Sequence, residues 1–252
     1  MWKTTKAVII GADHKMSGRP GSRNCQDACF VETRQGITIG IVSDGCSSGM
    51  YSEVGAHFSV NTLATMLFSA VARARSFGQE FTEWERLRLQ FLSHVSVVAE
   101  GMGDSYSSVI KQYFLFSIVG FVITPEGVTI FSVGDGSYFV NGKESKLGPF
   151  PKNEPPYIAY GLLNHEIPVF RLVRIAVDDV ATLVVGTDGV DYLGETESTI
   201  SNWVQRDETY NNSDRLRRYL VMHSPEKVEH GVIVPSKFKD DVAIVIARRF
   251  DQ

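Results

Sequence analysis

Hydrophobic positions along the chain first follow a strand pattern. Short runs rich in β-branched residues, bounded by Gly, Asp or Asn, predict strands at 7–12, 28–33 and 37–43. The run 37–43 is apolar enough to be buried on both faces of a sheet. The same pattern returns later in the chain and predicts further strands at 115–123, 128–133, 137–140, 169–177, 181–187 and 242–247. Turn residues at 124–127 predict that two of these strands form an antiparallel hairpin.

From residue 52 the period changes to three or four residues, which predicts two long amphipathic helices. The first apolar stripe consists of Ala56, Val60, Leu63, Leu67 and Ala70. The second consists of Trp84, Leu87, Phe91, Val95, Val98 and Met102. A further helical stretch with Trp203, Leu216 and Leu220 is expected over about 195–223. We interpret these stripes as faces that pack on a sheet, because a helix that covers a sheet must bury such a face.

Five prolines fall within 145–168, together with Gly148 and Gly161. This composition resists regular structure and predicts a long surface flap of the kind that often serves a site. No repeat, low-complexity tract or flexible linker divides the sequence. We therefore predict one domain over 1–252, with a flap insertion at about 141–168.

The composition narrows the classes of protein. The chain has 252 residues, of which 43% are hydrophobic and 21% charged, so it should fold around a substantial core. The net charge is −4 and no long basic run is present, which disfavours nucleic-acid binding. The apolar run near the start is too short for a signal peptide or a membrane span. We expect a cytoplasmic protein without a membrane segment, and a monomer by default.

Three cysteines, Cys25, Cys29 and Cys46, cannot all pair, and their spacing is not that of a zinc finger. We expect reduced and mostly buried thiols. Cys46 is not followed by the Cys-x5-Arg loop of cysteine phosphatases, because position 52 is Ser. A covalent cysteine mechanism is therefore disfavoured.

Acidic residues follow apolar strands at three places, as Asp44-Gly45, Asp135-Gly136 and Asp188-Gly189, and Asp240-Asp241 precedes the last strand. Each Asp-Gly pair by itself is a common turn dipeptide. If the strand ends converge, however, carboxylates a few Å apart repel by several kcal/mol at intermediate dielectric and must be protonated or share cations. An all-oxygen ligand set suits Mg²⁺ or Mn²⁺, and the lack of clustered His or Cys argues against zinc. Gly45, without a side chain, would let its carbonyl approach such a cation.

The order of five motifs resembles the metal-dependent protein phosphatases of the PP2C family over nearly the whole chain. The motifs are Asn24-Cys25-Gln26-Asp27-Ala28, Ser43-Asp44-Gly45, Val133-Gly134-Asp135-Gly136-Ser137, Thr187-Asp188-Gly189-Val190-Asp191 and Asp240-Asp241-Val242-Ala243-Ile244-Val245. The chain is most similar to the divergent bacterial-type branch, in which a His precedes the Cys-Gln-Asp-Ala segment; here this is His14.

The resemblance implies an α+β fold, a four-layer αββα sandwich of two antiparallel sheets flanked by helices, with a two-metal site at one end. In that picture Asp44 bridges two Mg²⁺ or Mn²⁺ ions, and Gly45 offers its carbonyl. Asp188 and Asp240 complete the second metal site, and Asp27 orders waters on the first. Asp135 lies where the family can hold a weaker third ion. A water that bridges the cations would attack phosphorus in line, without a phosphoenzyme.

The sequence also departs from the family. Gln26 stands where an acidic residue is usual; it can accept a hydrogen bond from a metal-bound water but adds no charge, so the first metal would bind less tightly. Ser22 occupies the position of the phosphate-binding Arg, and either Arg23 or Arg19 could take its place. Asp241 replaces the family's Asn, so Asp240 is the preferred ligand, with a one-residue ambiguity. Cys46 stands where many members carry a His, and His14 could lie near the site instead.

Three functional hypotheses follow. The first is an Mg²⁺- or Mn²⁺-dependent phosphatase that acts on phosphoserine and phosphothreonine in proteins, with Asp44, Asp188 and Arg23 in catalysis. The flap, with Lys143, Lys146 and Lys152 around it, would then touch the phosphoprotein substrate. The second is a pseudophosphatase that serves as a binding or regulatory module. The third is an unrelated phosphoesterase or sugar-phosphate hydrolase with convergent Asp-Gly turns.

Overall fold

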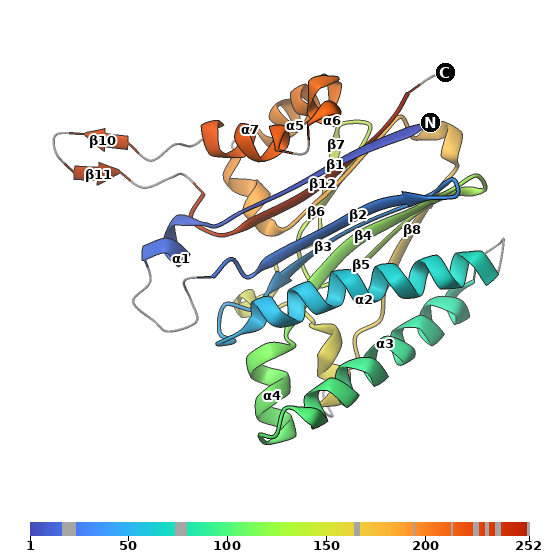
Figure 1. Cartoon of the computed structure of the whole chain (residues 1–252), viewed down its shortest axis with the longest axis vertical. Helices are drawn as coiled ribbons and strands as arrows, with labels where there is room; N and C mark the ends of the chain where they lie inside the picture. The colour runs from blue at the N-terminus through green and yellow to red at the C-terminus, as the bar shows by residue number, and fades with distance from the viewer. Residues whose placement is uncertain are drawn as a thin grey trace.

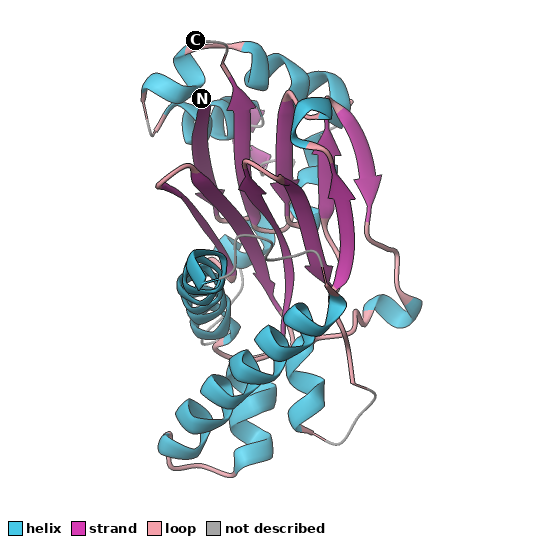
Figure 2. Cartoon of the chain, turned by 90° about the vertical axis from the view of Figure 1, so that its right-hand side faces the viewer, coloured by secondary structure: helices cyan, strands magenta, loops and turns pink. Residues whose placement is uncertain are grey.

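Two antiparallel sheets pack face to face in the computed structural model, with helices on both outer sides (Figures 1 and 2). This is the four-layer αββα arrangement that the motif order implies. The structure describes residues 1–16, 24–73, 80–163, 167–193, 195–212, 214–223, 227–229, 232–234 and 238–250.

The first sheet has the strand order β1-β12-β9-β6-β7. Its strands are β1 (Trp2–Ile9), β12 (Val242–Arg249), β9 (Thr182–Gly186), β6 (Ser137–Val140) and β7 (Lys143–Lys146). The first and last strands pair along their whole length, with Trp2 opposite Arg249 and Ile9 opposite Val242. This pairing brings the two termini together (Figure 1).

The second sheet has the strand order β2-β3-β4-β5-β8. Its strands are β2 (Asp27–Arg34), β3 (Ile37–Gly45), β4 (Phe116–Thr124), β5 (Gly127–Val133) and β8 (Arg171–Ile175). The predicted hairpin is confirmed, because Thr124 lies opposite Gly127 where β4 turns into β5. All nine residues of β4 are buried, as expected for a strand at the centre of a sheet covered on both faces.

Three layers of apolar side chains hold the sandwich together. Val42, Phe121, Val185 and Val245 belong to the layer between the two sheets. The other two layers each fill the space between one sheet and its helices. The layer on the second sheet includes Trp84, Phe91, Phe116 and Phe131. The layer on the first sheet includes Trp203, Leu216, Ile244 and Ile246. Each large side chain buried in this way contributes about 1.5–3 kcal/mol of transfer free energy.

Helices α2 (Ser52–Arg73), α3 (Phe81–Gly101) and α4 (Tyr106–Tyr113) pack on the second sheet. The α3 stripe is buried from Trp84 to Val95, as predicted, but Val98 and Met102 are exposed. The buried face instead continues through Ala99, four residues after Val95, so the prediction was wrong for the last turn. In α2 the predicted stripe is buried except for Ala70, which is half-buried.

Helix α2 is, within the described ranges, the one helix whose length and composition would allow it to cross a membrane. Half of its most apolar stretch is buried inside the protein. The helix lies along the second sheet and contacts β3 and β2 (Figure 1). Its apolar composition is therefore accounted for by packing on the sheet.

The helical stretch expected over 195–223 is three helices, α5 (Thr196–Gln205), α6 (Glu208–Asn211) and α7 (Arg215–His223), which cover the first sheet. A strand was expected at 7–12, but β1 spans Trp2–Ile9 and a short helix, α1 (Ala12–Met16), follows it. The pattern missed Trp2–Lys6 because polar residues dominate this part of an edge strand. It also missed α4 and the hairpin of β10 (Lys227–Glu229) and β11 (Val232–Val234).

The flap is less superficial than its composition predicts. Its first part contains β7, a short edge strand of charged residues. Two 3-10 helices follow, Pro151–Asn153 and Ile158–Leu162. Tyr157, Ile158 and Ala159 are buried in the layer between α3 and the second sheet. This segment is therefore part of the core and gives the flap a fixed base.

Candidate metal centre

Four aspartates that are far apart in the sequence line one cavity of about 220 Å³. Asp44 lies near the end of β3, Asp135 follows β5, Asp188 follows β9 and Asp240 precedes β12. The two sheets therefore bring these strand ends together, as the Asp-Gly pattern predicted. Gly45 and Cys46 also line this cavity.

Backbone pairing fixes the positions of the acidic turns. Asp27 lies opposite Asp44 in the β2-β3 pair. The Thr187 amide donates to the Ala243 carbonyl at 3.0 Å, and the Thr187 hydroxyl accepts from the Ala243 amide at 2.9 Å. These bonds tie the turn that carries Asp188 to the start of β12, which follows Asp240.

Two glycines are required by close approaches at these turns. A Cβ at Gly189 would overlap the backbone carbonyl of Asp241. A Cβ at Gly45 would lie 2.8 Å from both the Gln26 carbonyl oxygen and Ser52 Oγ. The Gly45 amide donates to the same Gln26 carbonyl at 3.1 Å. The Gly of each Asp-Gly pair thus lets neighbouring strands approach closely enough to form the cavity.

The carboxylates repel one another in a partly desolvated space. Burial, and then the charges of Asp27 and Asp188, raise the pKa of Asp44 well above its usual range. Burial, and then the charge of Asp240, raise the pKa of Asp188 to about 7. Among the described residues that line the cavity there is no Lys or Arg. The cluster is therefore stable only with bound protons or bound cations.

Asp135 gives an independent indication of a cation. Its Oδ1 is buried and has no hydrogen-bond partner. Burial raises the pKa of this carboxyl, although a hydrogen bond with Ser117 lowers it. A buried carboxylate oxygen without a donor is costly, and a hard divalent ion would satisfy it. The donor set thus fits Mg²⁺ or Mn²⁺.

Asp27 lies behind this cavity and is buried. Its Oδ2 accepts a hydrogen bond from the Thr187 hydroxyl at 2.6 Å. Burial, and then the charge of Asp241, raise the pKa of Asp27 well above its usual range. The side chain therefore links the turn before Asp188 to the strand beside Asp44, and its predicted contact with metal-bound waters stays a prediction.

Asp241 belongs to a different environment from Asp240. Its carboxylate is 1% exposed and accepts three hydrogen bonds, from the Gly11 amide at 2.7 Å, the Gln26 amide at 2.5 Å and His14 Nδ1 at 2.7 Å. Asp240, by contrast, lines the cavity. Of the two adjacent aspartates, Asp240 is thus the one that lines the cavity, and its role as the metal ligand stays a prediction.

His14 lies beside the acidic cluster, as its place in the sequence suggested. Its Nε2 is 3.8 Å from Asp240 Oδ1, and its ligand atoms and those of Asp240 and Asp241 lie within 4.8 Å of one another. The hydrogen bond with Asp241 raises the pKa of His14 against the opposing effect of burial. His14 thereby connects the buried Asp241 to the exposed side of Asp240.

Gln26 does not line the cavity. Its Nε2 donates to Ser52 Oγ at 2.8 Å and to the Gly49 carbonyl at 3.3 Å. Gln26 therefore holds the loop between β3 and α2. The expected hydrogen bond from a metal-bound water to Gln26 receives no support from this geometry.

The Arg and Lys side chains expected near the site fall into two groups. Arg19 and Arg23, with Ser22 between them, lie outside the described residues, so the predicted contact of either arginine with phosphate stays a prediction. Lys143, Lys146 and Lys152 are not among the described residues that line the acidic cavity. Lys146 Nζ is instead 2.8 Å from Asp191 Oδ1, in the turn that begins with Asp188.

The sequence predicted that the flap serves a site, but it did not single out the residues by which the flap lines the cavity. Glu154, Tyr157 and Tyr160 all line it. Burial, and then the proximity of Cys46, raise the pKa of Tyr157 above its usual range. The three cysteines are free and each residue is half-buried. Burial raises the pKa of the Cys25 and Cys29 thiols, as expected for mostly buried thiols. Aromatic residues inside a proline-rich segment were the available signal for the flap contacts.

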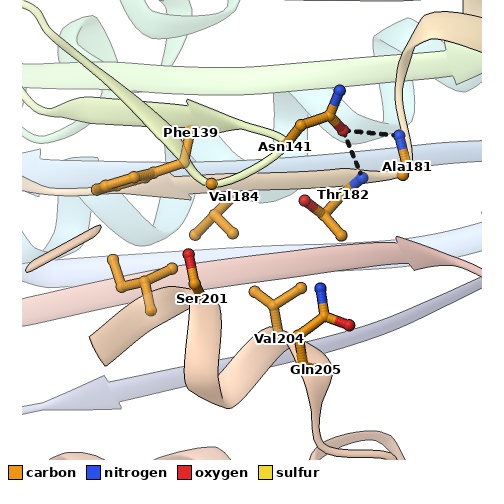
Figure 3. A pocket seen from close by; sticks show the side chains of 10 residues that line it. Phe139, Asn141, Ala181, Thr182, Val184, Ser201, Val204 and Gln205 are labelled. Atoms are coloured by element: carbon orange, nitrogen blue, oxygen red, sulfur yellow. Dashed lines mark hydrogen bonds between the residues drawn. The ribbon is translucent and has the colours of Figure 1, made fainter. Parts of the chain in front are cut away.

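A separate pocket of about 130 Å³ lies between the β6-β9 pair and α5 (Figure 3). Asn141 closes one side, where its Oδ1 accepts from the amides of Ala181 and Thr182 at 2.8 and 3.1 Å. The described residues that line it include no acidic, basic, His or Cys side chain. This pocket therefore offers no group for acid-base or metal chemistry.

Comparison with known proteins agrees with the order of motifs. A sequence profile of the family described as "Protein phosphatase 2C" matches residues 10–221. The chain belongs to this family. No match was found among curated proteins.

Solved structures share the fold at low sequence identity. The serine/threonine phosphatase Stp1 from Staphylococcus aureus aligns with a TM-score of 0.62 and 13% identity, over 100% of this chain and 96% of that one. The Mycobacterium tuberculosis serine/threonine phosphatase PstP/Ppp aligns with a TM-score of 0.55 and 12% identity, over 98% of both chains. A PstP catalytic domain in complex with two manganese ions aligns with a TM-score of 0.55 and 12% identity, over 99% of both chains.

Proposed function

We propose that this chain is a Mg²⁺- or Mn²⁺-dependent phosphatase that hydrolyses phosphoserine and phosphothreonine in proteins. The observation that carries the proposal is the convergence of Asp44, Asp135, Asp188 and Asp240 on one cavity without a cationic side chain among its described residues. The resemblance in fold to a phosphatase domain that binds two manganese ions supports the same reading.

Asp44, Asp188 and Asp240, with the Gly45 carbonyl, are the residues that would hold two divalent ions, and Asp135 would hold a weaker third. Bound divalent ions lower the pKa of a coordinated water toward neutrality and stabilise negative charge on the phosphoryl oxygens. The unpartnered Asp135 Oδ1 and the raised pKa values of Asp44 and Asp188 support this assignment.

Other residues position this ligand set. Thr187 holds Asp27 through its hydroxyl and β12 through its backbone amide, so the turns that carry Asp44 and Asp188 keep a fixed separation. Tyr157 and Tyr160 of the flap form part of the wall, and we propose that they restrict water around the phosphoryl group. Arg23, or Arg19, would bind the phosphate through a bidentate guanidinium contact.

Hydrolysis of p-nitrophenyl phosphate and of a phosphothreonine peptide tests this proposal. Activity should require added Mn²⁺ or Mg²⁺, stop with EDTA, and be lost in Asp44→Asn and Asp188→Asn. Asp104→Asn is the matched control, because Asp104 is exposed and lies in the α3-α4 connection, outside the cavity wall. Loss of activity in the control to the same extent would contradict the assignment.

A second candidate, the pseudophosphatase, is favoured by the position of Gln26, which replaces an acidic residue and points to Ser52. A folded wild-type protein that binds a phosphopeptide but shows no turnover at millimolar Mn²⁺ would support it. Preference for a small phosphorylated metabolite over phosphopeptides would instead indicate a different phosphoesterase.

A further inference from the structure

A second and larger cavity, of about 570 Å³, lies beside the acidic one, between the flap and the β5-β8 edge of the second sheet. We call it the flap pocket. Val133 and Gly134 contribute to it from the end of β5, and the flap contributes Phe150 and Pro156. The segment that leads into β8 completes the described wall with Ile167, Pro168, Val169 and Arg171.

The flap pocket adjoins the acidic cavity, because the two share part of their walls. Glu154, Pro155 and Tyr160 line both of them. Gly134, in the flap pocket, directly precedes Asp135 of the acidic cavity. A ligand with one group among the carboxylates can therefore place a neighbouring group in the flap pocket.

The wall of the flap pocket is mainly apolar. Ile167 is 59% exposed and Val169 is 46% exposed, although β-branched residues of this size are usually buried. Among the described residues its charged groups are Glu154 and Arg171, one of each sign. The Arg171 guanidinium lies over the Phe150 ring, 5.6 Å from its centroid. The formal charges cancel, so the pocket favours an uncharged apolar occupant over an acidic or basic one.

We propose that the flap pocket is a specificity subsite that binds a large apolar side chain close to the phosphorylated residue of a protein substrate. This inference rests on the proposed function and adds a sequence preference to it. A polypeptide is the occupant to which the geometry points, because an extended chain advances about 3.3 Å per residue and so reaches an adjoining cavity within a few residues. The volume is in the range of pockets that enclose such groups, about 300–1,000 Å³.

The test compares phosphothreonine peptides that differ at one position. In a Gly/Ser background, a single Leu is placed in turn at each of the four positions on either side of the phosphothreonine, and a matched Gln peptide is the reference. Release of inorganic phosphate gives kcat/KM for each peptide. For at least one position we expect Leu to exceed Gln by about tenfold, because burying an apolar side chain of this size gives a discrimination of that order.

Variants of the pocket locate the preference. Ile167→Arg and Val169→Arg each place a charge in the wall, and the ratio of Leu to Gln should fall close to one. Leu89→Arg is the matched control, since Leu89 is 55% exposed on α3 and is not in the wall. Each peptide rate is divided by the same protein's rate with p-nitrophenyl phosphate, so that a general loss of activity does not affect the ratio.

Two results would overturn the subsite: no preference for Leu at any position in the wild-type protein, or a preference that survives both pocket substitutions. Failure of the proposed function is seen separately, as absence of metal-dependent hydrolysis of p-nitrophenyl phosphate. In that case the labelled Leu and Gln peptides are compared by fluorescence anisotropy with the wild-type protein. A lower Kd for Leu that is lost in both variants supports the subsite, and equal Kd values refute it.

Discussion

Two acidic regions meet at the start of β12, and their carboxylates differ in the number of hydrogen-bond donors that they receive from the protein. Asp44, Asp135, Asp188 and Asp240 line the same cavity, and Asp135 Oδ1 has no hydrogen-bond donor. One residue further along the chain, Asp241 is fully buried and has three donors from other segments. The number of protein donors, rather than the residue type, decides whether a carboxylate is available to a cation.

This contrast shows that aspartate side chains have two different roles in this protein, a functional one in the cavity and a structural one at Asp241. Asp241 links the end of β1, α1 and the start of β2 to β12, so its partners are permanent parts of the fold. The cavity carboxylates destabilise the metal-free fold through mutual repulsion, and that energy is recovered when cations bind. Substitutions in the two regions should therefore have different consequences.

The largest effect is expected on catalysis. Asp188→Asn should lower kcat/KM for p-nitrophenyl phosphate with Mn²⁺ by about a thousandfold, since it removes a charged metal ligand; this corresponds to about 4 kcal/mol of transition-state stabilisation. Steady-state kinetics measure the loss. Activity within threefold of wild type would show that Asp188 is not a ligand.

The next effect concerns stability. Asp241→Ala should lower the free energy of unfolding by about 3 kcal/mol, because three buried donors lose their acceptor. Urea denaturation in EDTA measures this change. Asp240→Ala is the control from the cavity. In EDTA it should leave the free energy of unfolding unchanged or raise it. Equal destabilisation by both substitutions would remove the distinction between the two regions.

A smaller effect is expected from metal binding. At a hundredfold excess over Kd, Mn²⁺ should stabilise the wild-type protein by about 2.7 kcal/mol, since the ion binds the folded state alone. Asp44→Asn should lose most of this gain. Thermal unfolding with Mn²⁺ and with EDTA measures this stabilisation. An equal stabilisation of Asp44→Asn by Mn²⁺ would show that the ion binds elsewhere.

The smallest effect is expected on the pH dependence of the stability of the metal-free protein. The pKa of Asp188 is raised to about 7, above an unfolded value of about 4, so the folded state binds more protons between these limits. Stability should therefore fall as the pH rises through this window, by about 1–2 kcal/mol after allowance for solvent screening.

His14, whose pKa is also raised, contributes with the same sign. The difference in unfolding midpoint between wild type and Asp188→Asn removes the His14 contribution, because both proteins retain His14, and reports Asp188 together with its effect on the pKa values of Asp44 and Asp27. A wild-type protein in EDTA that becomes more stable from pH 5 to pH 7, relative to this variant, would contradict the prediction.

Much of the fold was predictable because its elements bury clear apolar patterns. The runs 115–123 and 242–247 are predicted as strands from their composition, and they correspond to β4 and β12, which are interior strands of the two sheets. Trp2–Lys6 and Lys143–Lys146 were missed, because edge strands are selected by pairing and carry polar residues. Exposure of Val98 was missed because Val98 and Ala99 are adjacent and both apolar, so the sequence does not show which of them faces the core.

The positions of Asp44, Asp135, Asp188 and Asp240 at strand ends can be read from the chain, because apolar runs stop or begin there and Gly follows three of the four. Which of the two adjacent carboxylates lines the cavity depends on the packing of the sheets. Asp240 and Asp241 are adjacent residues just before β12, and the chain pattern does not show which of them meets the donors of Gly11, His14 and Gln26. The tertiary structure likewise placed Tyr157 and Tyr160 in the wall, since their position depends on how the flap packs against α3.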